Sequence, residues 1–336
     1  MIRAFAAKEP KGRLVPFEYD PGPLKPEYVE IAVQACGLCH SDQSMINNEW
    51  GNSAYPLVAG HEVIGNVTAV GANVKQVKLG DTVGVGWLAG SCMVCHQCMS
   101  GNHNLCPSGE QTIVGRHGGF ADKVRCKAEW AIPLPKGLDA RKAGPLFCGG
   151  ITVFNPIVQF NVRPTERVGV VGIGGLGHLA LQFFNKWGCE VTAFTSSDDK
   201  RDTARGLGAH HVVNSRDPKQ VAKIAGSLDF IIVAVAVDLD WGMYLSALAP
   251  KGRLHIVGAI PNPIPVPAFS LIVGQHGISG SPVGPPAILR TMLDFCARHA
   301  IAPVVEYFPM SRVNDALAHL AAGKARYRIV LENDFA

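Results

Sequence analysis

Four closely spaced cysteines are the strongest chemical signal in this sequence. They lie in GSCMVCHQCMSGNHNLCPSG and follow the spacing C-x2-C-x2-C-x7-C. One loop of this kind can present four thiolates tetrahedrally to zinc, which leaves the ion no open position. A ferredoxin-type iron–sulfur site is the rival because proline follows the last cysteine, but the x7 gap does not match that pattern. We therefore expect a structural zinc bound by Cys92, Cys95, Cys98 and Cys106.

A second candidate metal set combines two cysteines and a histidine. Cys39 lies in GLCHSD, His61 stands beside Glu62 in GHE, and Cys148 lies in PLFCGG. Three protein ligands leave the fourth zinc position open, as in catalytic zinc sites. Taken singly, each cysteine is more often a small buried hydrophobe and the histidine a satisfied loop residue. Cys36 with Cys39 also matches a redox C-x-x-C.

A glycine-rich turn predicts a dinucleotide site. GIGGLG directly follows the apolar run RVGVV and opens the helical stretch LGHLALQFF. In the G-x-G-x-x-G fingerprint, Gly172 permits the tight turn, Gly174 the approach of a pyrophosphate, and Gly177 close packing of helix on strand. Gly175 and Leu176 complete the turn. A glycine-rich turn without a ligand is the alternative.

The end of the next strand, in TAFTSSDDKR, indicates which dinucleotide is bound. An NAD site usually carries an acidic residue there, about 20 residues after the glycines, for the ribose hydroxyls. Thr195 stands near that place and is followed by Ser196 and Ser197 and, one helical turn on, by Lys200 and Arg201. Small hydroxyls and two cations suit a 2′-phosphate and favour NADP(H), with a solvated helix face as the alternative for Arg201. Two intervening aspartates weigh against this, unless they only stabilise the first turn of a helix.

The elements that must position these residues change in character near residue 150. Before it, short β-type runs such as YVEIAVQA and VIGNVTAVG are broken by Gly, Pro and Asp, which indicates an irregular, mostly β domain. After it, strands and helices alternate, with apolar strands EVTAFT, LDFIIVAVA and GRLHIVGA. That pattern predicts a parallel sheet buried on both faces.

Composition limits the class of protein. The chain has 336 residues, of which 47% are hydrophobic and 17% charged, enough for two domains with substantial cores. Its formal net charge of +4 is scattered, so we expect no nucleic-acid partner. No run approaches the roughly 18 apolar residues of a membrane helix, and the N-terminus lacks an apolar signal core. The ten cysteines suit thiols or metal thiolates in a reducing cytoplasm, where we expect this protein.

Several segments together resemble one enzyme family. GLCHSD, GHEVIGNVTAVG, the four-cysteine lobe, GIGGLGH and RYRIV resemble the zinc-dependent medium-chain alcohol dehydrogenases over nearly the whole chain. CGGITVFNP, ISGSPVG and FTSSDDKR resemble their cinnamyl alcohol dehydrogenase-like branch. The resemblance implies an α/β fold with a GroES-like, mostly β catalytic domain over 1–150 and 289–336, including a zinc lobe at 90–107. A Rossmann doubly wound parallel sheet is implied over 151–288, together with a homodimer joined through these sheets.

The resemblance also implies roles at the metal. Cys39, His61 and Cys148 match the catalytic zinc ligands, so two zinc ions per chain are expected, one catalytic and one structural. Glu62 matches a carboxylate that approaches the metal when ligands exchange. Asp42 matches the acid that orients the ligating histidine.

A proton relay is implied beside the metal. Ser41 matches the hydroxyl that hydrogen-bonds the substrate oxygen. Relatives often have histidine three residues later, where this chain has Ser44. The relay then continues through ribose hydroxyls and water or through His40, for which contact with the cofactor phosphates is a rival role.

The cofactor and the substrate are implied to meet further residues. Thr152 and Leu176 match positions around the nicotinamide, and the backbone from Ser281 to Gly284, which includes Val283, lies near its carboxamide. Arg328 is expected to reach the pyrophosphate, with the arginine two residues earlier as a competitor. The substrate pocket is assigned to two aromatic residues, for which a place in the core is the alternative. These are Trp50 and Trp87.

The expected function is reduction of an aldehyde with NADPH, or oxidation of a primary alcohol in reverse, on aromatic or medium-chain substrates. Zinc would polarise the carbonyl while the nicotinamide delivers hydride. An NAD-dependent zinc polyol or formaldehyde dehydrogenase is the nearer alternative. A non-enzymatic NADPH sensor of the same fold is a second alternative. A metal-binding regulatory module is a third, but it would explain neither the glycine turn nor the three-ligand set.

Overall fold

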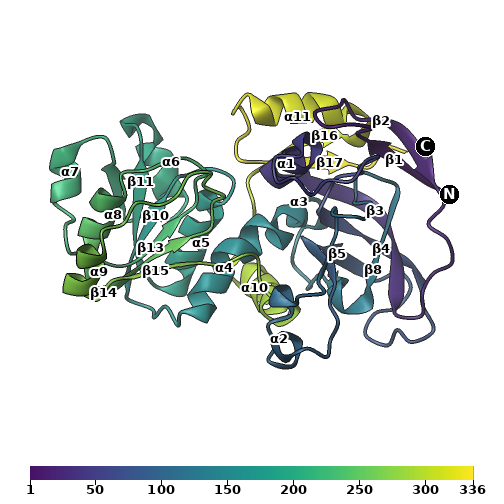
Figure 1. Ribbon diagram of the computed structural model, residues 1–336, viewed down its shortest axis with the longest axis horizontal. Coiled ribbons are helices and arrows are strands. Elements are labelled where there is room, and N and C mark those ends of the chain that lie inside the picture. Colours follow the sequence, from purple (N-terminus) through teal and green to yellow (C-terminus); the bar gives the residue numbers. More distant parts are fainter. Residues whose placement is uncertain (336) are drawn as a thin grey trace. The chain divides into compact units, whose positions relative to one another are not determined.

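The computed structural model describes residues 1–335 and divides the chain into two compact units (Figure 1). One unit joins both ends of the chain, Met1–Ile151 with Gly284–Ala336, and the other is the continuous segment Thr152–Val283. The boundaries expected from the sequence, after residues 150 and 288, fall close to this division. The first unit is mostly β and the second is built on a parallel sheet, which confirms the predicted α/β class.

A seven-stranded sheet forms the centre of the first unit. Its strands are β3 (Tyr28–Leu38), β4 (Glu62–Val70), β5 (Thr82–Val85), β8 (Lys123–Lys127), β9 (Ile132–Pro133), β16 (Val305–Pro309) and β17 (Arg328–Glu332). The order is β16-β17-β3-β4-β5-β9, with β8 also paired to β3. The long strand β3 is therefore the hub of this unit. Its antiparallel neighbours place Ile329 opposite Leu38 and Glu62 opposite Gly37, so both strands meet the end of β3.

Smaller elements surround this sheet. Two further strand pairs are β1 (Ile2–Ala6) with β2 (Val15–Tyr19), and β6 (Leu88–Gly90) with β7 (Glu110–Gln111). The α-helices are α1 (His40–Asn47), α2 (His96–Met99), α3 (Ala140–Ala143), α10 (Pro286–His299) and α11 (Val313–Ala321), while α4 (Gly149–Gln159) crosses the division between the units. Single 3-10 turns are η1 (His103–Leu105), η2 (Ala128–Trp130), η3 (Gly144–Phe147) and η5 (Met310–Arg312).

The core of the first unit is aliphatic. Val29 and Ile31 of β3 pack with Val63 and Val67 of β4 and with Phe120, and all five side chains are buried. Each such side chain contributes about 1.5 to 3 kcal/mol when fully buried. This core holds rigid the end of β3, where the candidate metal ligands follow.

The second unit is a six-stranded sheet in which all paired strands are parallel. Its strands are β10 (Arg167–Val171), β11 (Glu190–Thr195), β12 (His211–Asn214), β13 (Leu228–Val233), β14 (Leu248–Ile256) and β15 (Gly277–Gly280). The spatial order β12-β11-β10-β13-β14-β15 is the Rossmann order 3-2-1-4-5-6. The order reverses between β10 and β13, and dinucleotides bind in the crevice at the carboxyl ends of strands at such a point.

Helices follow most strands of this sheet. They are α5 (Gly177–Trp187), α6 (Arg201–Gly206), α7 (Pro218–Ala222), α8 (Trp241–Ala247) and α9 (Ala268–Gly274), with the turn η4 (Asp198–Lys200) before α6. In α5, Leu179, Phe183 and Phe184 are buried, and the helix ends at Gly188 in the left-handed conformation that favours glycine. Among the described residues, no helix is both long enough and apolar enough to cross a membrane.

Candidate active site

Four side chains from separate elements converge beyond the end of β3. Cys39 caps α1, His61 and Glu62 lie at the start of β4, and Cys148 directly precedes α4. One donor atom of each lies within 4.8 Å of the others, and all four residues are buried. The structure therefore brings the three expected ligands and Glu62 together. Cys39 is thus grouped with metal ligands and not with Cys36, which disfavours the redox pair as its role.

This group fits zinc. His61 Nε2 and Glu62 Oε2 are both buried without a hydrogen-bond partner among the described residues. Buried polar atoms are rarely left unpaired, so these two atoms indicate a missing ligand. Thiolate sulfur, imidazole nitrogen and carboxylate oxygen are zinc ligands at about 2.0 to 2.3 Å, and donors that lie this close together can share one ion.

Asp42 orients the histidine. Its Oδ1 lies 2.8 Å from His61 Nδ1 and accepts from the backbone N–H of Gly60 at 2.8 Å, while Oδ2 accepts from the backbone N–H of Cys39 at 2.9 Å. Because Nδ1 is engaged with the carboxylate, the lone pair of Nε2 is directed to the metal position. Burial by itself would lower the pKa of His61, but Asp42 raises it well above its usual range.

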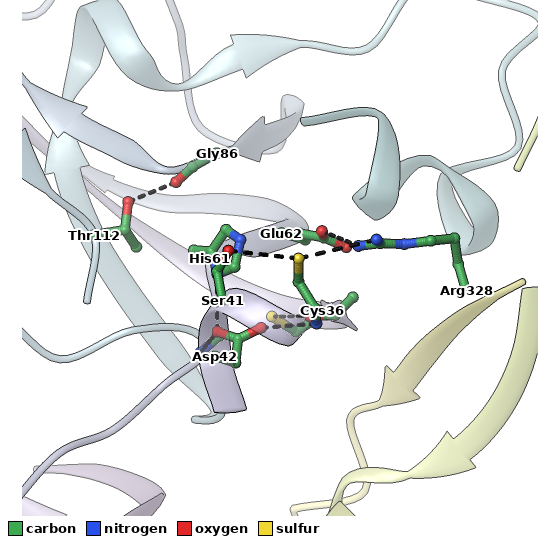
Figure 2. Close-up of polar contacts among 11 residues, drawn as sticks. Cys36, Ser41, Asp42, His61, Glu62, Gly86, Thr112 and Arg328 are labelled. Atoms are coloured by element: carbon green, nitrogen blue, oxygen red, sulfur yellow. Dashed lines mark hydrogen bonds and ion pairs between the residues drawn. The ribbon is translucent and has the colours of Figure 1, made fainter. Parts of the chain in front are cut away.

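Arg328 lies against the metal-ligand group. We expected it to reach the cofactor pyrophosphate; in the structure its guanidinium is only 4% exposed and pairs with Glu62 (Figure 2). Its Nη1 also lies 3.9 Å from Cys39 Sγ. The pairing of β17 with β3 brings this side chain to the ligands. The competitor, Arg326, donates its backbone N–H to Glu306 Oε1, and its guanidinium donates to carbonyl groups of its own turn.

The buried arginine balances the charge of the ligand set. A hydrogen bond from Cys148 and the charge of Arg328 hold the pKa of Cys39 well below its usual range. Burial raises the pKa of Glu62 to about 7, and Arg328 opposes that shift. The carboxylate of Glu62 packs directly against the backbone of Gly37. A Cβ at that position would lie 2.0 Å from Glu62 Oε2. Glycine at this position is therefore needed to admit the carboxylate.

The expected relay residues divide between two environments. Ser41 is half-buried, with its Oγ 3.8 Å from Cys39 Sγ. His40 is exposed at the start of α1. Ser44 donates its hydroxyl hydrogen to Glu49 Oε2 at 2.6 Å on the surface. Only Ser41 thus lies beside the metal ligands.

The two tryptophans extend outward from the histidine. The ring centroid of Trp87 lies 5.0 Å from that of His61, edge to face, and Trp50 packs on Trp87 at 5.8 Å. Trp50 remains 43% exposed. Thr112 holds Trp87 in place, since its backbone N–H donates to Trp87 O at 2.8 Å and its hydroxyl to Gly86 O at 2.6 Å (Figure 2). The sequence offered no signal for Thr112.

The four-cysteine lobe forms a second complete ligand group. Its four Sγ atoms lie within 4.8 Å of one another. Backbone N–H groups of the lobe point at the sulfurs, as from Cys95 to Cys92 Sγ at 3.3 Å and from Cys92 to Cys106 Sγ at 3.4 Å. The N–H groups of Val94 and Cys95 lower the pKa of Cys92 to about 6. Such donors stabilise thiolates, so the lobe fits a zinc ion with four protein ligands.

The glycine turn of the second unit fits a dinucleotide. Gly172 has φ +89°, which favours glycine, and a Cβ on Gly177 would lie 1.7 Å from Gly172 O. A Cβ on Gly174 would meet no atom within 4 Å, so the backbone there faces open space. Gly175 and Leu176 lead into α5, whose N-terminus provides N–H groups and a favourable dipole for phosphate.

At the end of β11, the predicted phosphate residues differ in availability. The hydroxyl of Thr195 is buried and donates to Ser197 O at 2.7 Å. Ser196 and Lys200 are exposed, and Ser197 is half-buried. Thr195 therefore stabilises the turn after β11, and its contact with the cofactor stays a prediction.

The residues expected around the nicotinamide lie in the second unit. Thr152 is buried on α4. After β15, Val283 O accepts a hydrogen bond from Asn155 Nδ2 at 3.1 Å, and Ser281 Oγ lies 3.0 Å from His255 Nε2. The sequence analysis missed both partners. A histidine within the apolar strand GRLHIVGA was the available signal for one of them.

Comparison with known proteins agrees with these two sites. Residues 25–136 match the family described as alcohol dehydrogenase GroES-like domain, and residues 175–298 match the family described as zinc-binding dehydrogenase. The chain is 56% identical over 333 residues to aldehyde reductase AdhA of Synechocystis sp., covering 99% of each chain.

Solved structures agree as well. A cinnamyl alcohol dehydrogenase from Sorghum bicolor superposes with a TM-score of 0.94 at 38% identity, covering 98% of this chain and 97% of that one. An enzyme named CAD from Helicobacter pylori, solved with NADP(H), gives 0.90 at 30% identity with coverage of 98% and 97%. With its two metal-binding groups and its Rossmann sheet, the chain belongs to the zinc-dependent medium-chain alcohol dehydrogenases, in their cinnamyl alcohol dehydrogenase-like branch.

Proposed function

We propose that this protein reduces aromatic or medium-chain aldehydes to primary alcohols with NADPH, and catalyses the reverse oxidation. The observation that carries the proposal is the buried group of Cys39, His61 and Cys148, in which His61 Nε2 lacks a partner among the described residues. Trp87 stands beside that histidine. The site thus combines an open metal position with an aromatic wall.

The residues around the metal prepare the reaction. When bound, zinc supplies a Lewis acid for the substrate oxygen and NADPH supplies the hydride. Asp42 holds His61 in the tautomer that leaves Nε2 as the metal ligand. Ser41 donates the proton to the substrate oxygen during reduction and accepts it during oxidation. Arg328 offsets the negative charge of the thiolates and of Glu62.

The preference for NADPH rests on the end of β11. No acidic residue occupies the strand end itself, and Ser196 and Lys200 are exposed there. Asp198, which could have bound ribose hydroxyls, is already engaged with Arg201 at 2.7 Å and with Asn214 at 3.2 Å. Lys200 is therefore the cation available for a 2′-phosphate.

We assign the substrate wall to Trp87 and Trp50. Their edge-to-face contact and the contact of Trp87 with His61 form a continuous aromatic surface leading out from the metal ligands. Aromatic rings pack well against other aromatic rings in offset and edge-to-face arrangements. This surface favours substrates such as cinnamaldehyde and benzaldehyde.

The second unit supports a homodimer as part of the proposal. Helix α9 buries none of its residues, and Phe269 is 74% exposed with Ile272 and Val273 beside it. The adjacent strand β15 is an edge of the described sheet. An apolar patch next to an unpaired strand edge is suited to a second copy of the same chain. In sedimentation velocity, Phe269→Glu should yield monomers while Leu79→Glu, an exposed leucine of the first unit, should not.

A cytoplasmic location is also proposed. The described cysteines are all free of disulfide bonds. Those of the four-cysteine lobe and of the group around His61 form metal-ligand sets, and the remaining ones are buried. Thiols and thiolate metal sites persist in a reducing compartment. Fractionation of the native cells, with the protein recovered outside the reducing compartment, would contradict this.

The deciding experiment compares the two cofactors. Initial rates of cinnamaldehyde and benzaldehyde reduction are measured with NADPH and with NADH. A clear NADPH preference that falls in Lys200→Ala, but not in Lys219→Ala, supports the proposal; the control lysine is exposed on α7 of the same unit. A preference for NADH would favour the polyol or formaldehyde dehydrogenase alternative, and absence of turnover with either cofactor would refute the enzyme assignment.

A further inference from the structure

His255 is a buried polar residue that the proposed reaction does not yet use. It lies on β14 with no exposed surface, between Phe160 at a ring centroid distance of 5.0 Å and Phe230 at 5.9 Å. Burying an imidazole among aromatic rings is costly unless its nitrogen atoms are hydrogen-bonded. The hydrogen-bond partners of the two ring nitrogens therefore indicate the role of His255.

Both ring nitrogens bond to serines of the next segment. Nδ1 lies 3.0 Å from Ser279 Oγ, and Nε2 lies 3.0 Å from Ser281 Oγ. Burial, with the charge of Arg253, lowers the pKa of His255 to about 4, so the ring is neutral near pH 7. A neutral imidazole has one donor and one acceptor, so it accepts from one serine and donates to the other. Both hydroxyls can rotate to suit.

The second of these bonds extends the sheet beyond its last backbone pair. His255 is the ladder partner of Ser279, and the ladder between β14 and β15 ends with Ile256 opposite Gly280. Ser281 lies one residue past that end, and its side chain is bonded to β14 through the imidazole. A second side chain, Asn155 of α4, bonds Val283 O at 3.1 Å. Two side chains thus hold the short segment from Ser281 through Val283.

This segment has backbone groups available for a ligand. Pro282 has no N–H, and among the described residues neither the carbonyl of Ser281 nor the N–H of Val283 has a hydrogen-bond partner. The carbonyl of Ser281 and the N–H of Val283 are left for a partner outside the chain. They lie after the carboxyl end of β15, and ligands of open parallel sheets bind beyond the carboxyl ends of the strands. A planar amide, which offers one donor and one acceptor, matches them.

We propose that His255 is a positioning residue that holds Ser281 so that the backbone of the segment Ser281–Val283 can bind the carboxamide of the nicotinamide ring. The inference rests on the proposed function, because it requires NADP(H) as the ligand. His255 does not touch the cofactor. It acts through Ser281.

The test separates the nicotinamide half of the cofactor from the rest. Dissociation constants are measured for NADPH and for 2′-phospho-ADP-ribose, which lacks the nicotinamide. In His255→Phe, the constant for NADPH should rise about tenfold, equivalent to about 1.4 kcal/mol. The constant for 2′-phospho-ADP-ribose should stay within about twofold. His255→Gln, whose amide retains a donor and an acceptor, should recover most of the affinity.

Two further variants keep the test decisive. Ser281→Ala removes the same bond with little change in volume and should reproduce the selective loss if His255→Phe fails to fold. His211→Phe, an exposed histidine on β12 of the same sheet, should leave both constants unchanged. Equal weakening of both ligands, or no weakening of NADPH, would overturn the inference while leaving the proposed function intact. If the unaltered protein bound neither ligand, the proposed function itself would fail and the inference with it.

Discussion

Replacing Asp42 by asparagine should weaken the catalytic zinc site selectively. Asparagine has nearly the same shape as aspartate but replaces one acceptor oxygen by an amide group that only donates. In the structure, Asp42 Oδ1 is hydrogen-bonded to Gly60 N and His61 Nδ1, and Oδ2 accepts from Cys39 N. The side chains of Asp42 and His61 have no solvent exposure. The single amide oxygen of asparagine cannot accept hydrogen bonds from all three of these nitrogen atoms.

The expected loss follows from these contacts. The orientation that keeps the amide oxygen at the Oδ1 position turns the NH2 group toward the N–H of Cys39, donor against donor. An unpaired buried donor costs about 1 to 3 kcal/mol of folding stability. His61 also loses the carboxylate that raises its basicity, and loss of such an outer partner typically lowers metal affinity about 10- to 100-fold. Asp42→Asn should therefore bind catalytic zinc more weakly by about one to two orders of magnitude.

The assay uses the second metal site as an internal reference. Protein is titrated with a zinc chelator, and the zinc retained per chain is measured together with turnover. In Asp42→Asn, one zinc ion and the activity should be lost at a lower chelator concentration, while the ion of the four-cysteine lobe is retained. Asp229→Asn is the control, since this aspartate pairs with Arg167 in the second unit at 2.8 Å. Unchanged affinity at both sites, or equal loss from both, would refute the reasoning about Asp42.

Other predictions follow from single contacts. Gly177→Ala should lower the melting temperature, because its Cβ would lie 1.7 Å from Gly172 O, whereas Gly174→Ala, with no atom within 4 Å, should keep that temperature and weaken NADPH binding; equal melting temperatures would contradict this. The pKa of His255 is about 4 in the folded chain and lies below its ordinary 6.5. Since only the unfolded chain takes up the proton between these values, stability should fall by about 3 kcal/mol as the pH drops from 6.5 to 4. Urea unfolding should show this fall to be smaller in His255→Gln, and an identical fall in both proteins would count against a buried neutral ring. Trp87→Ala should raise the KM for cinnamaldehyde more than that for propanal, and parallel changes in steady-state kinetics would remove Trp87 from the substrate wall.

Arg328 and Thr195 make contacts that reasoning from the sequence did not predict. Both were assigned to the cofactor because of their place in a motif, and the structure adds that one lies against Glu62 and the other donates its hydroxyl hydrogen to Ser197 O. The destination of a side chain depends on strand pairing and on the nearest acceptor. Neither can be read from the residue's immediate neighbours in the sequence.

The sequence by itself determined the features that depend on short-range geometry. The four-cysteine lobe lies within one loop, and the turn around Gly172 and Gly177 joins a strand to the helix after it, so spacing alone constrains both. Composition and the alternation of apolar runs likewise predicted the α/β class, because strands and helices differ in their hydrophobic period.

Only the tertiary structure decided how distant residues meet. Cys39, His61 and Cys148 come from separate elements, and their grouping depends on the register of β3 with β4. The pairing of β17 with β3 adds Arg328 to that group. The register between paired strands decides which side chains face each side of the sheet. A shift of one residue would turn every side chain of the strand to the opposite face. Because the packing of the whole sheet sets that register, the ligand group could be recognised by resemblance, whereas its geometry required the assembled fold.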